Sequence, residues 1–142
     1  MSRHHFVNGP PRARPRPIVD AADALALISL AMHSPLQHEV IAFLLDEQGV
    51  GGTIVVVTDA TDDDAVGHVV QTVCLAADRA DLRRLVVASV RPDGGLKPGD
   101  LGRWFDADDS AVANGIRLIE WYVIGPDGAE CPRDLIGESD RW

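Results

Sequence analysis

Apolar positions recur with a helical period in the first clear element of the chain. Leu25, Ile28 and Met32 fall on one side of a helix, and Asp20 precedes them as a residue type that caps helix N-termini. The pattern therefore predicts a helix over residues 20–32.

Two apolar runs follow at residues 39–46 and 53–58, with a glycine-rich stretch between them. Short runs of this kind, rich in β-branched residues, are typical of strands, so the pair predicts a β-hairpin. A broad apolar face, preceded by a threonine and three carboxylates, predicts a second helix over residues 65–79. The run 84–90, which ends shortly before Pro92, predicts a buried strand that leads into a loop.

The remaining segments continue this order of helix and strand. A third helix is predicted over residues 100–114, with Gly115 as its C-terminal stop. Another strand is predicted over residues 116–124. Residues 126–128 predict a turn, after which a last short strand can follow. A hairpin joined to crossover helices predicts an α/β (α+β) fold, a three-layer α/β/α arrangement around a mixed sheet, with function expected where strands run out into loops.

Composition sets the first residues apart from the rest. Residues 1–17 hold four prolines and four arginines but no acidic side chain, which predicts a disordered arm because such a segment cannot pack a core. The expected organisation is this arm, one domain over residues 18–130 and a C-terminal tail over residues 131–142.

The charge is just as unevenly distributed. The net charge is −9, and because the arm contributes four positive charges, the rest of the chain carries −13. A body this acidic repels phosphate backbones, so only the arm can attract nucleic acid. The side chains available for that purpose are Arg3, Arg12, Arg14 and Arg16.

No apolar run reaches the roughly 18 residues that a membrane span needs, and no apolar signal core follows the N-terminus. We therefore expect a cytoplasmic protein that does not enter a membrane. Cys74 and Cys131 are too few and too far apart for a disulfide framework or a thiolate metal site.

Residues 85–100 and 115–125 carry a family likeness. The first stretch is an apolar strand followed by a loop with Pro92, Gly94 and Pro98, and the second ends in Tyr-Val-Ile-Gly. This resembles the RadC-type branch of the JAB/MPN (JAMM metalloprotease-like) domains, where a strand leads into His-Asn-His-Pro-Ser-Gly-Asp-Pro-Thr-Pro-Ser and a later strand ends near His-Val-Ile-Val-Gly. The resemblance implies a cytidine-deaminase-like architecture for the domain over 18–130, in a bacterial family associated by name with DNA repair.

The positions that differ from the family are those that would hold its zinc. Ser89 and Arg91 stand at the two histidine positions, Gly99 at the serine position and Gly102 at the aspartate position, while Pro92 matches. Zinc requires ligands that offer lone pairs, whereas an arginine brings a permanent cation to the metal's position. The resemblance thus implies a degenerate site with no metal, no cofactor and no catalytic residue of the family type.

Two carboxylates remain near this loop in the family-like arrangement. Asp100 lies two residues before the expected aspartate, and Glu39 corresponds to the upstream glutamate. Both are candidates to pair with Arg91, either as a structural salt bridge or around an anion-binding arginine.

Aromatic and histidine side chains leave further alternatives open. Trp121 is either a core residue or, together with Arg91, a binding anchor near the altered loop. His33, His38 and His68 are not spaced as a metal site, and solvated or capping roles are the expectation.

The expected function is therefore that of a pseudoenzyme, a protein-interaction or scaffold module that binds a protein partner or a second copy of itself. One alternative is a hydrolase of the peptidase or nuclease kind, with an atypical site around Glu39, Asp100 and a histidine, or with Ser89 as nucleophile. Another is a DNA-repair-associated protein that recruits nucleic acid through its basic arm.

Overall fold

The structure, a computed structural model, describes residues 3–8, 17–77 and 81–142, with residues 3–8 described by their backbone. Its elements run in the order β1 (Arg3–Asn8), α1 (Ala21–Ala31), β2 (Glu39–Leu45), β3 (Gly51–Thr58), α2 (Ala65–Ala76), β4 (Arg84–Val90), α3 (Asp100–Ala113), β5 (Arg117–Gly125), β6 (Gly128–Glu130) and the 3-10 helix η2 (Pro132–Ile136). Each element predicted from the apolar pattern is present within a few residues of its expected bounds.

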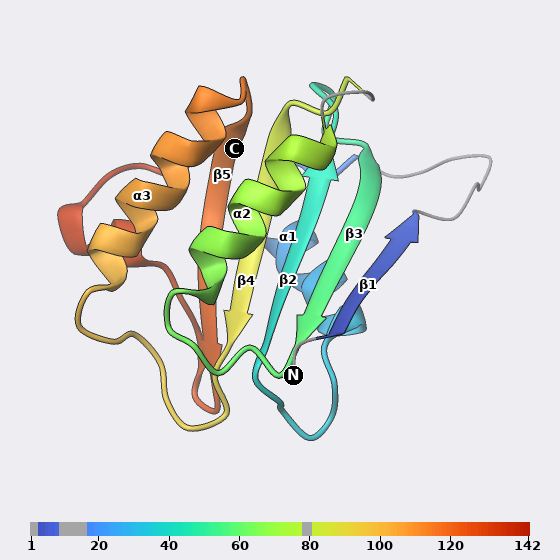
Figure 1. Cartoon of the computed structure of the whole chain (residues 1–142). Helices are drawn as coiled ribbons and strands as arrows, with labels where there is room; N and C mark the ends of the chain where they lie inside the picture. Colours follow the sequence, from blue (N-terminus) through green and yellow to red (C-terminus); the bar gives the residue numbers. More distant parts are fainter. Residues whose placement is uncertain (1–2, 9–16, 78–80) are drawn as a thin grey trace.

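The described strands form one mixed sheet in the order β1-β3-β2-β4-β5-β6. Strands β4 and β5 are parallel, and every other neighbouring pair is antiparallel. The predicted α+β fold with a mixed sheet is thus confirmed. Because β4 and β5 are parallel, their carboxyl ends lie at the same end of the sheet, as Figure 1 shows.

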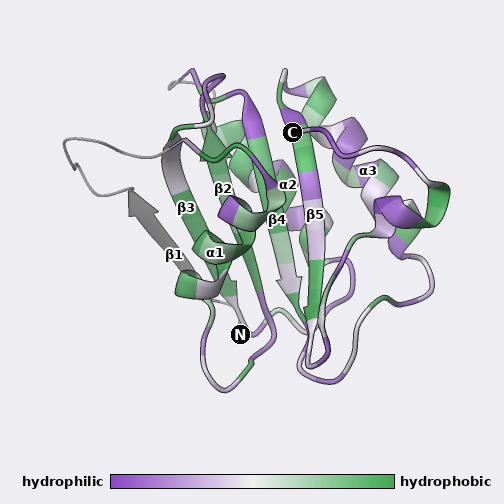
Figure 2. Cartoon of the chain, turned by 180° about the vertical axis from the view of Figure 1, so that it is seen from behind, coloured by the Kyte–Doolittle hydropathy of each residue, from purple (hydrophilic) through white to green (hydrophobic). Residues whose placement is uncertain are grey.

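Helices cover both faces of this sheet (Figures 1 and 2). Helices α2 and α3 pack on one face, where their apolar side chains join those of the strands in one core that includes Val40, Val87 and Trp104. Helix α1 packs on the other face through Ala24 and Ile28. The central strands β2 and β4 are buried along almost their whole length, which is why their sequences are continuous apolar runs rather than alternating ones.

The caps of the first and third helices follow from the residues that precede them. Asp20 caps α1 as expected, since its Oδ1 accepts a hydrogen bond from the backbone N–H of Asp23 at 2.9 Å. Gly99 precedes α3 with a φ of 90°, a left-handed conformation that glycine adopts without steric cost.

The N-terminal arm differs in part from the expectation. Residues 3–8 form β1, which pairs antiparallel with β3, so they belong to the sheet rather than to a disordered arm. The edge of β3 offers unpaired backbone groups to any nearby extended segment, and local composition does not reveal such pairing. Arg12, Arg14 and Arg16, three of the four arginines through which nucleic acid could be attracted, lie outside the described residues.

Residues 131–142, which were expected as a C-terminal tail, pack on the domain. Arg133 donates to Glu120 Oε2 at 2.9 Å from Nε and at 2.6 Å from Nη2. Arg141 donates to Asp108 Oδ1 at 2.7 Å, and Trp142 packs against the core on the α1 face. Arg133 and Arg141 thereby tie this segment to β5 and α3.

Within the described part of the chain, no helix combines the length and the apolar character that crossing a membrane requires.

Candidate functional site

The candidate site lies where β4 and β5 end, in the loop that leads to α3. The N–H of Arg91 donates to the carbonyl oxygen of Ile124 at 2.8 Å, which ties the start of this loop to the end of β5. Gly125 packs so closely against the loop that a Cβ there would meet the oxygen of Gly94 at 2.8 Å. The loop is therefore fixed over the sheet edge by backbone contacts.

A buried ion pair between Arg91 and Asp100 occupies the centre of the site. Arg91 Nη1 donates to Asp100 Oδ2 at 2.6 Å, and Nη2 donates to Oδ1 at 2.9 Å. Both residues are at least 95% buried, with 5% of Arg91 and 1% of Asp100 exposed. Two parallel hydrogen bonds between a guanidinium and a carboxylate form the strongest kind of side-chain pair, so this contact closes the loop onto α3.

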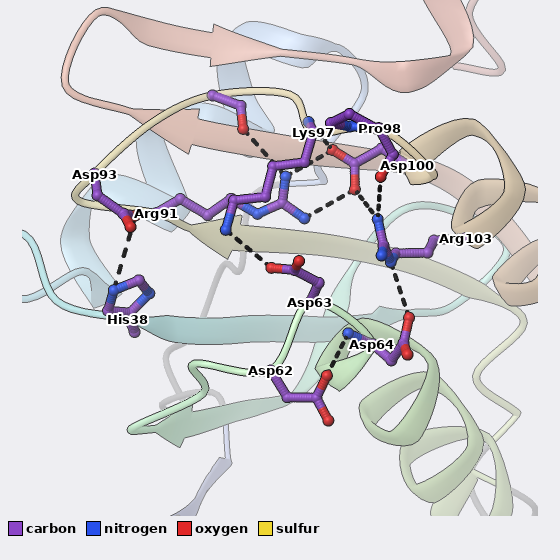
Figure 3. A network of polar contacts seen from close by, with 11 residues as sticks. His38, Asp62, Asp63, Asp64, Arg91, Asp93, Lys97, Pro98, Asp100 and Arg103 are labelled. Carbon is purple, nitrogen blue, oxygen red and sulfur yellow. Dashed lines mark hydrogen bonds and ion pairs between the residues drawn. The ribbon is translucent and has the colours of Figure 1, made fainter.

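Three further hydrogen bonds satisfy the loop and the Asp100 carboxylate (Figure 3). The backbone N–H of Lys97 donates to Asp100 Oδ2 at 2.6 Å, and Arg103 Nη1 donates to Oδ1 at 3.0 Å. Arg91 Nη1 also donates to the carbonyl oxygen of Gly95 at 3.1 Å. Asp100 thus holds the loop, the first turn of α3 and the end of β4 together.

The same network extends to the segment before α2. Lys97 Nζ donates to Asp63 Oδ1 at 2.9 Å, and Arg103 Nε donates to Asp64 Oδ1 at 2.9 Å. The hydrogen bond from Lys97 lowers the pKa of Asp63. The acidic segment before α2 is therefore partly neutralised by this loop and by α3, and it does not stand free as a cation site.

Opposing effects act on the pKa of Asp100. Burial raises the pKa of this carboxyl, but the hydrogen bonds from Arg91, Lys97 and Arg103 and the charge of Arg91 hold it below its ordinary value. Asp100 is therefore a carboxylate at neutral pH and is not poised to act as a general acid.

Because of the ion pair, the free energy of unfolding should depend on pH in the acidic range. The pKa of Asp100 is lower in the folded than in the unfolded chain. Its contribution to the free energy of unfolding is therefore fully present above the ordinary carboxyl pKa of about 3.9, and it is lost as pH falls through the pKa of the folded state. Burial raises the pKa of Glu120, so its contribution has the opposite sign and weakens as pH rises. Urea unfolding across acidic pH should show a shallower loss of stability below about pH 4 in Asp100→Asn than in the unchanged chain. Equal slopes would contradict this assignment.

Ser89 and Trp121 lie next to the ion pair. The indole Nε1 of Trp121 donates to Ser89 Oγ at 2.9 Å, and the Arg91 guanidinium carbon lies 5.8 Å from the centroid of the indole ring. Trp121 is fully buried and Ser89 is 7% exposed. Trp121 is thus a core residue rather than a surface anchor. An indole N–H cannot activate Ser89 as a nucleophile, because it is a donor and not a base.

Glu39 lies beside β4 but not within the ion pair. It is opposite Val90 in the antiparallel register, and directly opposed residues point to the same face of a sheet. Val90 belongs to the core on the α1 face. Glu39 accepts from the N–H of His33 at 3.0 Å, and its Oε2 lies 2.6 Å from His33 Nδ1. The expected pairing of Glu39 with Arg91 is therefore wrong, because the pleat turns its side chain to the other face.

The other residues expected at the site have backbone roles or none. Pro92 lies half-buried in the turn after Arg91, and Gly99 precedes α3. Gly102 follows Asp100 by two residues, which places it on another side of the helix, and a Cβ there would meet nothing within 4 Å. The position that the resemblance assigns to a ligand aspartate therefore does not face Arg91.

The histidines do not gather. His33 belongs to the Glu39 pair, His38 lies 3.8 Å from Asp93, and His68 is exposed on α2. In residues 17–77 and 81–142, no group of three or more His, Cys, Asp or Glu side chains is arranged to hold a metal ion.

Sequence reasoning found Arg91 and Asp100 but missed Arg103, Lys97 and Asp63. Arg103 follows Asp100 by three residues on a helix, a spacing that favours contact and was a usable signal. Asp63 is 34 residues from Lys97 in sequence, so only the fold brings them together.

No known family model matches this chain. A search of curated proteins likewise finds no match.

Proposed function

We propose that this chain is a non-catalytic domain of the RadC-type JAB/MPN kind, a cytoplasmic module that works by binding a protein partner or a second copy of itself. The observation that carries the proposal is the buried Arg91–Asp100 pair at the carboxyl ends of two parallel strands. Ligand and catalytic sites are commonly built at such strand ends. In this chain the position is filled by a satisfied ion pair.

The zinc site of that family does not fit the side chains of this loop. Arg91 offers no lone pair and brings a permanent positive charge. Both oxygens of Asp100 already accept charge-assisted hydrogen bonds at 2.6–3.0 Å. A divalent cation would have to displace the guanidinium and leave it buried without a partner, which is strongly unfavourable.

An atypical hydrolase receives less support from the geometry. Its proposed carboxylates are divided between two faces of the sheet, with Glu39 on the α1 face and Asp100 with the α2–α3 core. General acid–base chemistry requires both groups within reach of one substrate. Ser89 Oγ accepts a hydrogen bond from the indole N–H of Trp121, which cannot serve as a base.

Metal analysis tests the proposal directly. Tag-free protein, purified without added metal or chelator, should contain zinc well below one ion per chain, because no described side chains form a site for it. His4→Ala/His5→Ala serves as the control, since two adjacent histidines can bind zinc weakly without belonging to a site.

Peptidase and nuclease assays complete the test. We expect no turnover that depends on metal or on Arg91. Stoichiometric zinc that persists in the His4→Ala/His5→Ala variant, together with turnover abolished by a chelator, would overturn the proposal.

A further inference from the structure

Arginines line one cleft at the end of the sheet opposite Arg91. Figure 1 shows this end of the sheet, where β4 and β5 begin. Arg84 and Arg117 are register partners at the first positions of β4 and β5, and the N–H of Arg117 donates to the carbonyl oxygen of Arg83 at 2.8 Å. With Arg141 they line an open cleft of about 790 Å³ between the strand ends, the β2–β3 turn and the second half of α3.

Three of the four arginines of this cleft, Arg83, Arg84 and Arg117, are the cations that the fold leaves least engaged. Arg84 and Arg117 form no ion pair with any residue in the described ranges. The ion pair of Arg83 is a 3.9 Å contact to the fully exposed Asp81, and its Nη1 donates to the carbonyl oxygen of Leu82 at 3.2 Å. Arg141 is held by Asp108 at 2.7 Å. The other described basic side chains all have closer carboxylate partners elsewhere, namely Arg91, Lys97, Arg103 and Arg133.

This arrangement costs stability in the isolated chain. Like charges at register positions on neighbouring strands repel, and Arg84 and Arg117 occupy such positions. Acidic side chains are plentiful, yet the cleft contributes only Glu47 and Asp108, and Asp108 is already paired with Arg141. The positive charge of the cleft is therefore left for a ligand to neutralise.

We infer that this cleft binds an acidic peptide segment of a protein partner. Planar guanidinium groups hold carboxylates through two parallel hydrogen bonds, and the three least engaged arginines line the same cleft. The cleft also presents Val112, which is 66% exposed, so an extended peptide gains apolar contact beside its charged contacts.

Two other anion classes fit the cleft less well. A nucleic acid strand would meet the acidic remainder of the domain on either side of the cleft. A compact phosphate would lie near the C-terminal half of α3, where the helix dipole is negative, and it would gain no helix N-terminus. A peptide can place its carboxylates against separate arginines and avoid Glu47.

Fluorescence anisotropy with a labelled hexaglutamate peptide tests this inference on the full chain. We expect salt-sensitive binding to the unchanged protein, and about tenfold weaker binding to Arg84→Gln and to Arg117→Gln, because each removes a charge-assisted contact. Lys97→Gln removes the same charge at the opposite end of the sheet and should bind as the unchanged protein does. Hexaglutamine should not bind.

Thermal unfolding separates lost contacts from lost folding. The Arg84→Gln and Arg117→Gln variants should melt no lower than the unchanged chain, since each relieves the repulsion between the two arginines. The inference is overturned if hexaglutamate does not bind, if it binds all variants equally, or if inorganic phosphate or oligothymidine binds the cleft more tightly than the peptide.

This inference rests on the proposed function, because it names the class of partner for a binding module. The two can nevertheless fail separately. If the chain contains no zinc and does not bind hexaglutamate, only the assignment of the cleft is wrong. If the chain contains zinc, is active and still binds the peptide, only the non-catalytic assignment is wrong.

Discussion

Replacing Asp100 with alanine is expected to lower the free energy of unfolding by roughly 3–5 kcal/mol. The variant leaves the Arg91 guanidinium buried without its carboxylate, and it also removes the acceptor of the Lys97 N–H and of Arg103. An uncompensated buried charge is among the most destabilising changes that one substitution can produce. Chemical denaturation followed by circular dichroism measures the loss.

Two further variants make this prediction specific. Asp109→Ala removes an exposed carboxylate from the same helix and should change stability by less than about 0.5 kcal/mol. The double variant Arg91→Met/Asp100→Leu replaces both charges by apolar groups and should recover most of the loss. If Asp100→Ala unfolds like Asp109→Ala, the ion pair does not hold the loop.

Replacing Trp121 with alanine should cost about 3–5 kcal/mol, because it empties a fully buried ring volume in the core under the loop. The ring also lies 5.8 Å from the Arg91 guanidinium, and its N–H satisfies Ser89 Oγ. The substitution therefore weakens the support of the ion pair as well as the packing. Urea unfolding gives the size of the effect.

Trp121→Phe separates these contributions. Phenylalanine keeps an aromatic face for Arg91 but loses the donor to Ser89, so we expect a loss of about 1–3 kcal/mol. Adding Ser89→Ala to Trp121→Phe removes the unsatisfied hydroxyl and should return part of that loss. Equal destabilisation by phenylalanine and alanine would show that ring packing contributes little at this position.

Local signals in the sequence were sufficient for most of the fold. The apolar run of β4 and the breaker Pro92 set the end of a buried strand, and Asp20 set the start of α1, because these signals act within a few residues. The pairing of β1 with β3 was beyond such signals. The six residues of β1, Arg-His-His-Phe-Val-Asn, show no clear alternation of apolar and polar residues, and their partner strand is far away in sequence.

For the site, the sequence indicated which residue types are present, but it did not show to which face of the sheet each side chain points. It indicated that Arg91 stands where a lone-pair ligand would be needed, and it gave Asp100 as a candidate partner. It could not show that Glu39 points to the opposite face, because the face of a side chain reverses with a shift of one residue in register.

The sequence by itself therefore determined the helices and strands from α1 to β5, and that the loop after β4 carries an arginine and no imidazole. The tertiary structure decided that Arg91 is neutralised by Asp100, that Glu39 pairs with His33, and that Arg83, Arg84, Arg117 and Arg141 share one cleft. The physical reason is the sequence distance over which each kind of interaction acts. Caps, breakers and periodicity act between near neighbours in the chain, whereas charges meet through strand register and helix packing, which bring together residues many positions apart.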